Sequence, residues 1–246
     1  MTKISNMKTN NFKELQEIIR SKKDSFTSYE NAAQEFMGKF YEKFKDSIVL
    51  SRIFLTAPYS KLPLKNKQFV DKLTQIHSLT DLVNDNTLIL SLVGSAGLEN
   101  EWHDRKNSKN HVGIPLASAD FIDEVPMMSR LLKQLGLNLN YIASDDTKLV
   151  KHTLGRMNGV FYVRDAKTEV DIKGRKIIAA QDFVNKYDVK TVMGFGGGYT
   201  GNYPFYTAII FLNEEIEPTR ARLISAEMAF FKIVTMRIVK ERVFND

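Results

Sequence analysis

The chain has 246 residues, 43% of them hydrophobic and 26% charged, which are ordinary proportions for a globular protein and exclude disorder as a description of the whole chain. It contains no cysteine, so disulfides, thiolate metal sites and cysteine nucleophiles are excluded. The formal net charge of +6 is carried by lysines and arginines that alternate with acids, so we expect a solvated surface and no nucleic-acid partner.

The first segment, residues 1–46, predicts a helical N-terminal extension. A short first helix is indicated by Phe12, Leu15, Ile18 and Ile19. Over residues 29–45 apolar residues recur at three- and four-residue intervals, which gives a second helix one apolar face that must be buried. The residues of that face are Ala33, Phe36, Met37, Phe40 and Phe44.

The middle segment, residues 47–217, predicts an α+β domain in which an antiparallel sheet of five to six strands has its helices on one side. Pro58 should end the first strand because proline has no backbone N–H for the ladder, and Gly136 should end a helix that begins near Asp120. The expected strands are 47–56, 87–93, 159–163, 190–196 and 205–212, and the expected helices are 65–83, 120–135 and 180–187. A hairpin turn at Gly201 and Asn202 is expected to join the last two strands.

The last segment, residues 218–246, predicts one long helix that begins at Pro218 and runs to about Val243. It carries two apolar stripes, one of Ile224, Met228, Phe231, Val234 and Ile238, the other of Leu223, Ala226, Phe230 and Ile233. A helix with two apolar faces must bury both. The sheet can cover one face. The other is covered either by the N-terminal helices or by the same helix of a second copy in a homodimer.

A polar segment, residues 95–118, holds the single tryptophan, Trp102. Loops of this length inside compact domains are uncommon and tend to be functional. Trp102, Arg105 and His111 beside the turn Ile114-Pro115-Leu116 predict a pocket lid, in which the planar fork of Arg105 binds a carboxylate or phosphate. The alternative is that Trp102 packs the loop onto the sheet and Arg105 pairs with a structural acid.

The glycine-rich run 194–199 has a superficial likeness to a phosphate-binding loop. Tyr199 stands where the dinucleotide fingerprint requires its third glycine, and a strand follows instead of a helix. The run is therefore interpreted as a strand end and turn. In a modified version, Phe195, Gly196 and Gly197 let a ligand lie close to the backbone of the sheet.

Metal and catalytic sites find little support. His103 and His111 are eight residues apart, which fits no standard metal site, so no metal site is expected. Axial ligation of haem needs only one histidine, so the sequence leaves the identity of any cofactor open. Residues 94–97 are one residue short of a nucleophile elbow. Since no nucleophile, base and orienting group can be assembled, we expect no catalytic residues and a protein that is not an enzyme.

No apolar run approaches the roughly 20 residues that cross a bilayer. The N-terminal lysines are not followed by the apolar segment of a secretory signal. These observations predict that the protein has no membrane segment and lies in the cytoplasm.

The runs 94–135, 192–197 and 205–212 together resemble the GAF-like N-terminal sensor region of bacterial signalling proteins, which often precedes PAS and histidine-kinase modules. The matching positions are Trp102, Arg105, His111, Pro115 and Gly196, whereas His103 replaces an asparagine of that pattern and Ala117 a proline. The resemblance implies a GAF/PAS-like sheet and brings no catalytic residues. No output domain follows Asp246, so we expect the chain to work alone, to act on a separate signalling partner, or to be an excised input domain.

Together these patterns predict a ligand-sensing module that binds a small molecule, an anion among the candidates, under the 94–118 loop and signals through its terminal helices. The expected ligand-binding residues are Trp102, His103, Arg105, His111, Pro115, Phe195, Gly196 and Gly197. Replacing Arg105 or His111 by alanine should then lower ligand affinity and leave the melting temperature nearly unchanged. The alternatives are an enzyme acting on a small anionic metabolite and a partner-binding scaffold with a filled core.

Overall fold

The computed structural model describes residues 3–136, 139, 158–199 and 204–246. Its centre is a six-stranded sheet with the strand order β3-β2-β1-β6-β5-β4, in which every pair of neighbours is antiparallel. The strands are β1 (Ile48–Pro58), β2 (Leu88–Gly97), β3 (Gly113–Pro115), β4 (Asn158–Val163), β5 (Thr191–Gly198) and β6 (Phe205–Leu212). The expected α+β class, with an antiparallel sheet of five to six strands and flanking helices, is confirmed.

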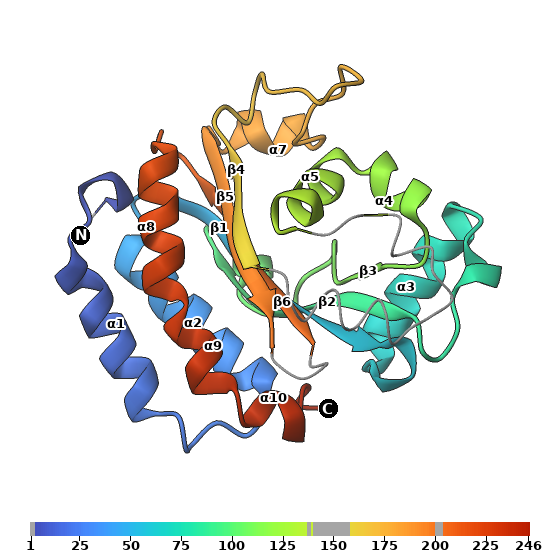
Figure 1. Cartoon of the computed structure of the whole chain (residues 1–246), viewed down its shortest axis with the longest axis horizontal. Helices are drawn as coiled ribbons and strands as arrows, with labels where there is room; N and C mark the ends of the chain where they lie inside the picture. Colours follow the sequence, from blue (N-terminus) through green and yellow to red (C-terminus); the bar gives the residue numbers. More distant parts are fainter. Residues whose placement is uncertain (1–2, 137–138, 140–157, 200–203) are drawn as a thin grey trace.

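Helices cover both faces of this sheet, so the expectation of helices on one side is wrong. On one face lie α1 (Thr9–Ser21), α2 (Tyr29–Phe44), α8 (Pro218–Met228), α9 (Phe230–Thr235) and α10 (Ile238–Glu241). The other face carries α3 (Leu64–Ile76), α4 (Ala119–Glu124), α5 (Pro126–Gln134) and α7 (Gln181–Lys186) (Figure 1). Because β1 and β2 are covered on both sides, they are buried along nearly their whole length, which explains their continuous apolar runs.

Each face has its own apolar core. The first core joins the apolar stripe of α2 to the sheet and to α8–α10, so the predicted segments 1–46, 47–217 and 218–246 share buried contacts. The second core joins the opposite side chains of the sheet to α4, α5 and α7. The division into those three segments stays a prediction.

Proline explains why the helix expected over 120–135 is two helices. Pro126 has no N–H to donate and its ring clashes with the preceding turn, so α4 ends at Glu124 and Pro126 opens α5. Gly136 follows α5 with a φ of +95°, a left-handed conformation that glycine adopts without steric cost, so its predicted role at the helix end is confirmed.

The single C-terminal helix that we expected is divided into α8, α9 and α10. The chain leaves helical geometry at Arg242 and runs back to the start of α2, where the carbonyls of Arg242 and Val243 accept hydrogen bonds from the amides of Tyr29 and Glu30 at 2.8 Å each. These amides have no acceptor within their own helix, so the segment after α10 supplies the hydrogen-bond acceptors that the N-terminus of α2 lacks.

The first apolar stripe of this segment is buried except for the half-buried Val234, and the second is mixed: Phe230 is buried while Leu223 and Ile233 are exposed. The N-terminal helix α1 contacts both α8 and α9, which supports the intramolecular alternative for part of the second stripe. The homodimer through this helix stays a prediction.

No helix in the described parts of the chain combines the length and apolar character that crossing a membrane requires.

The segment expected as a continuous polar loop, residues 95–118, contains regular structure. Strand β2 extends to Gly97, a short 3-10 helix follows at Asn100–Trp102, and β3 pairs with β2. Residues 98–99, 103–112 and 116–118 lack regular structure within it. The expected turn at Gly201 and Asn202 lies outside the described residues.

Candidate functional site

A cavity of about 310 Å³ lies between the sheet and the layer of α5 and α7, within the volume range of small-molecule sites. Strands β1, β2, β3 and β6 form its floor with Leu50, Arg52, Phe54, Leu90, Ile114, Ile209 and Phe211. Its walls come from the start of α5, from the segment that leads into α7, and from the loop after β2; they are Val125–Met128, Ile177–Ala180, Phe183, Glu101, Trp102 and Lys109–His111.

Trp102 is placed in the cavity wall by aromatic packing. Its ring meets the rings of Phe183 and Tyr187 edge-on, with centroids 5.7 and 5.0 Å apart. A side chain on Gly97 would come within 2.9 Å of the Trp102 ring, so glycine is needed there for the indole to reach this position. Trp102 thus both packs the loop onto the domain and lines the cavity, which combines the two alternatives considered for it.

Arg52 is a buried charge on the floor of this apolar cavity. It lies in the central strand β1, and only 7% of its surface is exposed. Its Nη1 donates to the carbonyl of Asn110 at 3.1 Å, whereas its Nε has no hydrogen-bond partner in the described structure. Desolvation lowers the pKa of Arg52 to about 10, and no ion pair of the described residues involves it.

Arg52 is not among the residues expected from the sequence, although the sequence holds a signal for it. The segment Ile48–Pro58 is a buried central strand in which Leu50, Arg52 and Phe54 share one face. A charged residue among the inward positions of such a strand is unusual, because burying an unpaired charge is costly.

His111 lines the same cavity close to Arg52. Its backbone has a φ of +57°, a left-handed conformation that is uncommon outside glycine and that often occurs at functional sites. The side chain is exposed, yet the protein atoms around the cavity and the Arg52 cation lower the pKa of His111. We take it to be neutral at pH 7.

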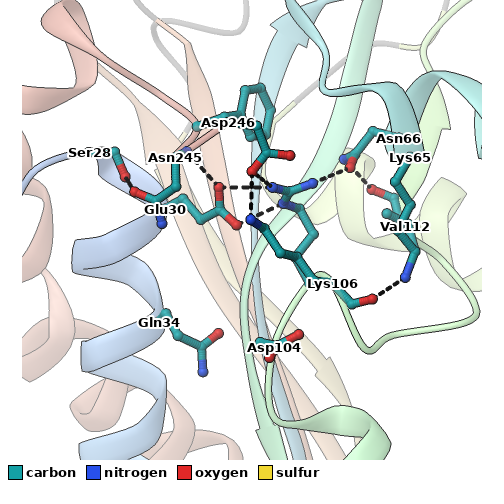
Figure 2. Close-up of polar contacts among 12 residues, drawn as sticks. Ser28, Glu30, Gln34, Lys65, Asn66, Asp104, Lys106, Val112, Asn245 and Asp246 are labelled. Atoms are coloured by element: carbon teal, nitrogen blue, oxygen red, sulfur yellow. Dashed lines mark hydrogen bonds and ion pairs between the residues drawn. The ribbon is translucent and has the colours of Figure 1, made fainter.

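Arg105, the residue expected to bind an anion, makes structural ion pairs instead. It is 1% exposed, and its Nε and Nη2 donate to the two carboxylate oxygens of Glu30 at 2.8 and 3.1 Å. Its Nη1 donates to Asn66 Oδ1 at 2.9 Å, and Nη2 also donates to Asp246 Oδ1 at 2.8 Å. Figure 2 shows Glu30, Asn66 and Asp246 converging in this cluster. The guanidinium is therefore engaged by the protein itself and is absent from the cavity lining.

We call this cluster the terminal clasp, defined as Arg105, Glu30, Asn66, Asn245 and Asp246. The amide of Asn245 donates to Glu30 Oε2 at 2.9 Å, and the Phe244 ring lies 5.5 Å from the guanidinium carbon of Arg105. The clasp ties the loop after β2 to the start of α2, to α3 and to the end of the described chain.

The other expected ligand-binding residues lie elsewhere. The Nε2 atom of His103 is hydrogen-bonded to the Gly97 carbonyl at 2.9 Å. Pro115 lies in β3 and is paired with Ile89 of β2. Phe195 packs in the core on the opposite face of the sheet. A side chain on Gly196 would lie 2.3 Å from the Tyr206 carbonyl, so its absence serves the packing of β5 on β6, and Gly197 also pairs within the sheet. Of the eight expected residues, Trp102 and His111 line the cavity.

A second depression, of about 550 Å³, lies beside Pro58, Pro204 and residues 239–244. The charged residues that line it are all exposed, so it has no counterpart of the buried Arg52. Over the described part of the chain, no group of three or more histidine, aspartate or glutamate side chains is arranged to hold a metal ion.

No protein-family model matches the chain, and no curated protein matches it. Among solved structures, the chain is similar to the crystal structure of the phycoerythrobilin-bound GAF domain from a cyanobacterial phytochrome. The identity is 9% and the TM-score is 0.48, over 94% of this chain and 96% of that chain. So few residues are shared that no ligand or activity is transferred from that protein to this one.

Proposed function

We propose that the chain is a ligand-responsive regulatory module of the GAF-like type, in which a small molecule in the cavity changes the state of the terminal segments. The observation that carries this proposal is that one short segment serves two sites. Within residues 101–111, Trp102 and His111 line the cavity, while Arg105 forms the terminal clasp.

The coupling follows from this shared segment. A ligand that contacts Trp102 and His111 favours the loop positions that suit those contacts. A ligand shifts a conformational equilibrium by its difference in affinity for the two states, so any loop position that changes the Arg105 ion pairs also changes how firmly residues 242–246 hold the start of α2.

The lining of the cavity supports binding more than turnover. Its described members include no serine, threonine, tyrosine or aspartate, and its one carboxylate, Glu101, pairs with Lys109. A serine or threonine nucleophile, which an adjacent base activates, is therefore not found among them. We therefore propose a binding module and keep the enzyme as the alternative that an activity screen would detect.

Native mass spectrometry of freshly purified protein tests whether the cavity holds a ligand. We expect a bound small molecule in the wild-type protein and its loss in Ile114→Trp, because the indole would fill the cavity from its floor. Leu90→Phe, which fills the same space from β2, should give the same result. A molecule retained by both variants would place the binding site elsewhere and contradict the proposal.

Hydrogen exchange tests the coupling. We expect ligand removal to change the exchange of amides in residues 28–34 and 238–246, which meet at the terminal clasp, as well as in the loop. A response confined to the cavity would show binding without regulation.

The cytoplasmic location, the bacterial signalling context and the separate partner stay predictions. So does the homodimer, which sedimentation of a monomer at micromolar concentration would contradict.

A further inference from the structure

We infer that Arg52 is the anion-binding residue of the cavity and that the ligand is a small amphipathic carboxylate, with its charged group at Arg52 and its apolar body against the surrounding walls. This inference rests on the proposed function, since it requires that the cavity bind a ligand. It replaces Arg105, the residue that the sequence suggested for this role, with a residue in the centre of the sheet.

The guanidinium of Arg52 is a buried positive charge without an ionic partner among the described residues. Burying an ionised group without a partner is expensive, and buried charges in proteins are normally paired. Arg105 shows the usual solution, because two carboxylates surround it. Arg52 is also buried, with 7% of its surface exposed, and within the described residues its single hydrogen bond goes to the neutral carbonyl of Asn110.

The N–H groups of the Arg52 guanidinium have a geometry that suits a carboxylate. A guanidinium presents its N–H groups as a rigid planar fork that matches a carboxylate in a two-pronged arrangement. The Nε of Arg52 is buried without a partner, and the residue lines the cavity. No described residue accepts a hydrogen bond from this atom, and we assign the missing acceptor to a ligand that approaches the guanidinium from the cavity.

The described lining of the cavity holds little that could act as the counter-charge of Arg52. Of the described residues that line the cavity, Glu101 alone carries an acid. Its side chain is 59% exposed and lies 2.5 Å from Lys109 Nζ, which is itself 71% exposed. A solvated pair does not neutralise a charge on the cavity floor, so none of the described lining residues supplies the counter-charge, and we assign it to the ligand.

The surfaces around Arg52 indicate what the uncharged part of the ligand is. The floor around Arg52 is made by Leu50, Phe54, Leu90 and Ile209, and the facing wall by the start of α5 and by Phe183. These surfaces offer apolar contact over most of the volume, which does not suit an inorganic anion. One cation beside a neutral histidine favours a single negative charge, so a monocarboxylate fits better than a dianionic phosphate.

Trp102 provides the measurement, because it is the chain's single tryptophan and lines the cavity. We propose titrating its fluorescence with octanoate and with octanamide, which has the same chain and no charge, at constant ionic strength. Three proteins are compared: wild type, Arg52→Gln, and Arg130→Gln as a matched control, since Arg130 pairs with Glu169 away from the cavity.

In wild type and in Arg130→Gln we expect octanoate to bind about tenfold or more tightly than octanamide, as is typical of charge-assisted hydrogen bonds. In Arg52→Gln the two affinities should agree within about twofold. Inorganic phosphate should not displace octanoate, because it lacks the apolar body.

Each contrary result has a different meaning. Equal binding of octanoate and octanamide by wild type overturns the inference while the cavity and the proposed function stand. A preference for octanoate that survives in Arg52→Gln places the anion site on another residue. Displacement of octanoate by phosphate overturns the amphipathic assignment. Absence of binding by either compound to any of the three proteins contradicts the inference, whereas the proposed function is judged separately by native mass spectrometry of the wild-type protein and its cavity-filling variants.

Discussion

Arg105 and Glu30, 75 residues apart in the chain, form a two-pronged ion pair in which Arg105 Nε and Nη2 lie 2.8 and 3.1 Å from the two oxygens of the Glu30 carboxylate. Both side chains are buried, with 1% and 7% exposed. Glu30 lies in the first turn of α2, where the helix dipole also favours a negative charge. The pair thus fixes the loop after β2 to a helix on the opposite face of the sheet.

We therefore expect Arg105→Met to lower the free energy of unfolding by about 3–5 kcal/mol, because it leaves the buried carboxylate of Glu30 without its partner. Urea denaturation of the ligand-free protein measures this change. Arg130→Gln, which breaks the partly exposed pair with Glu169, should cost about 1 kcal/mol or less. A loss in Arg105→Met no larger than in this control would contradict a structural clasp. The large expected loss also reverses the expectation from the sequence that Arg105 could be replaced without a change in melting temperature.

Arg52→Met is expected to act in the opposite direction. The methionine removes a buried cation that has no ion pair in the described structure and keeps much of the apolar volume, so the ligand-free protein should gain about 1 kcal/mol of stability even after the hydrogen bond to Asn110 is lost. Thermal unfolding without ligand tests this prediction.

Arg164→Met, at an exposed position, is the control for Arg52→Met and should change stability by about 0.5 kcal/mol or less. If Arg52→Met were strongly destabilised, Arg52 would serve the fold and not the ligand. A residue whose removal stabilises the fold is instead typical of a functional site.

The sequence predicted the parts of the fold that depend on local pattern. The apolar stripe of α2, the end of α5 at Gly136 and most of each central strand follow from residue periodicity and from the backbone freedom of glycine. Strand β3 was missed, because three residues within a polar segment carry no periodic signal. The break before Pro126 was missed as well, although proline itself was the available signal.

The candidate site was only partly predictable for a different reason. Trp102 and His111 stand out in a polar segment by residue type, and both line the cavity. Arg105 stood out equally, and nothing local indicates that Glu30 and Asp246 will reach it, since that contact depends on the packing of both ends of the chain. Which arginine is paired and which is left for a ligand is decided by tertiary structure.

Gly94 is expected to be intolerant of any side chain, for a reason that the structure makes specific. An added Cβ would lie 2.6 Å from the Ala33 carbonyl of α2. The helix cannot move away easily, because the Gln34 side chain bonds both the amide and the carbonyl of Ser95, at 3.0 and 2.9 Å. Gly94→Ala should therefore cost about 1–3 kcal/mol, as overpacking usually does.

Gly38→Ala is the matched control for Gly94→Ala. Gly38 lies within α2, and an added Cβ there would meet nothing within 4 Å, so alanine should stabilise the helix by about 0.5–1 kcal/mol. The two substitutions make the same chemical change and should shift the urea midpoint in opposite directions. A similar shift in both would mean that α2 does not pack closely on β2.

His111 should make the binding of a carboxylate depend on pH. Its residue lines the same cavity as Arg52, Lys109 and Glu101, and the pKa of its side chain is lowered from 6.5 by the surrounding protein and by Arg52. As the pH falls through that lowered pKa, His111 gains a positive charge beside the anion site. The affinity for octanoate should then rise at every pH at which the carboxylate of octanoate is still ionised.

The stability of the ligand-free protein should change in the opposite sense. Between pH 6.5, the ordinary value for histidine, and the lowered pKa of His111, the unfolded chain binds more protons than the folded one, so the free energy of unfolding decreases as the pH falls. His111→Asn should weaken both dependences, and asparagine tolerates the left-handed backbone of this position better than most residues. Fluorescence titrations and urea denaturation at several pH values measure the two effects. An octanoate affinity that falls on acidification, or a dependence unchanged in His111→Asn, would place the titrating group elsewhere.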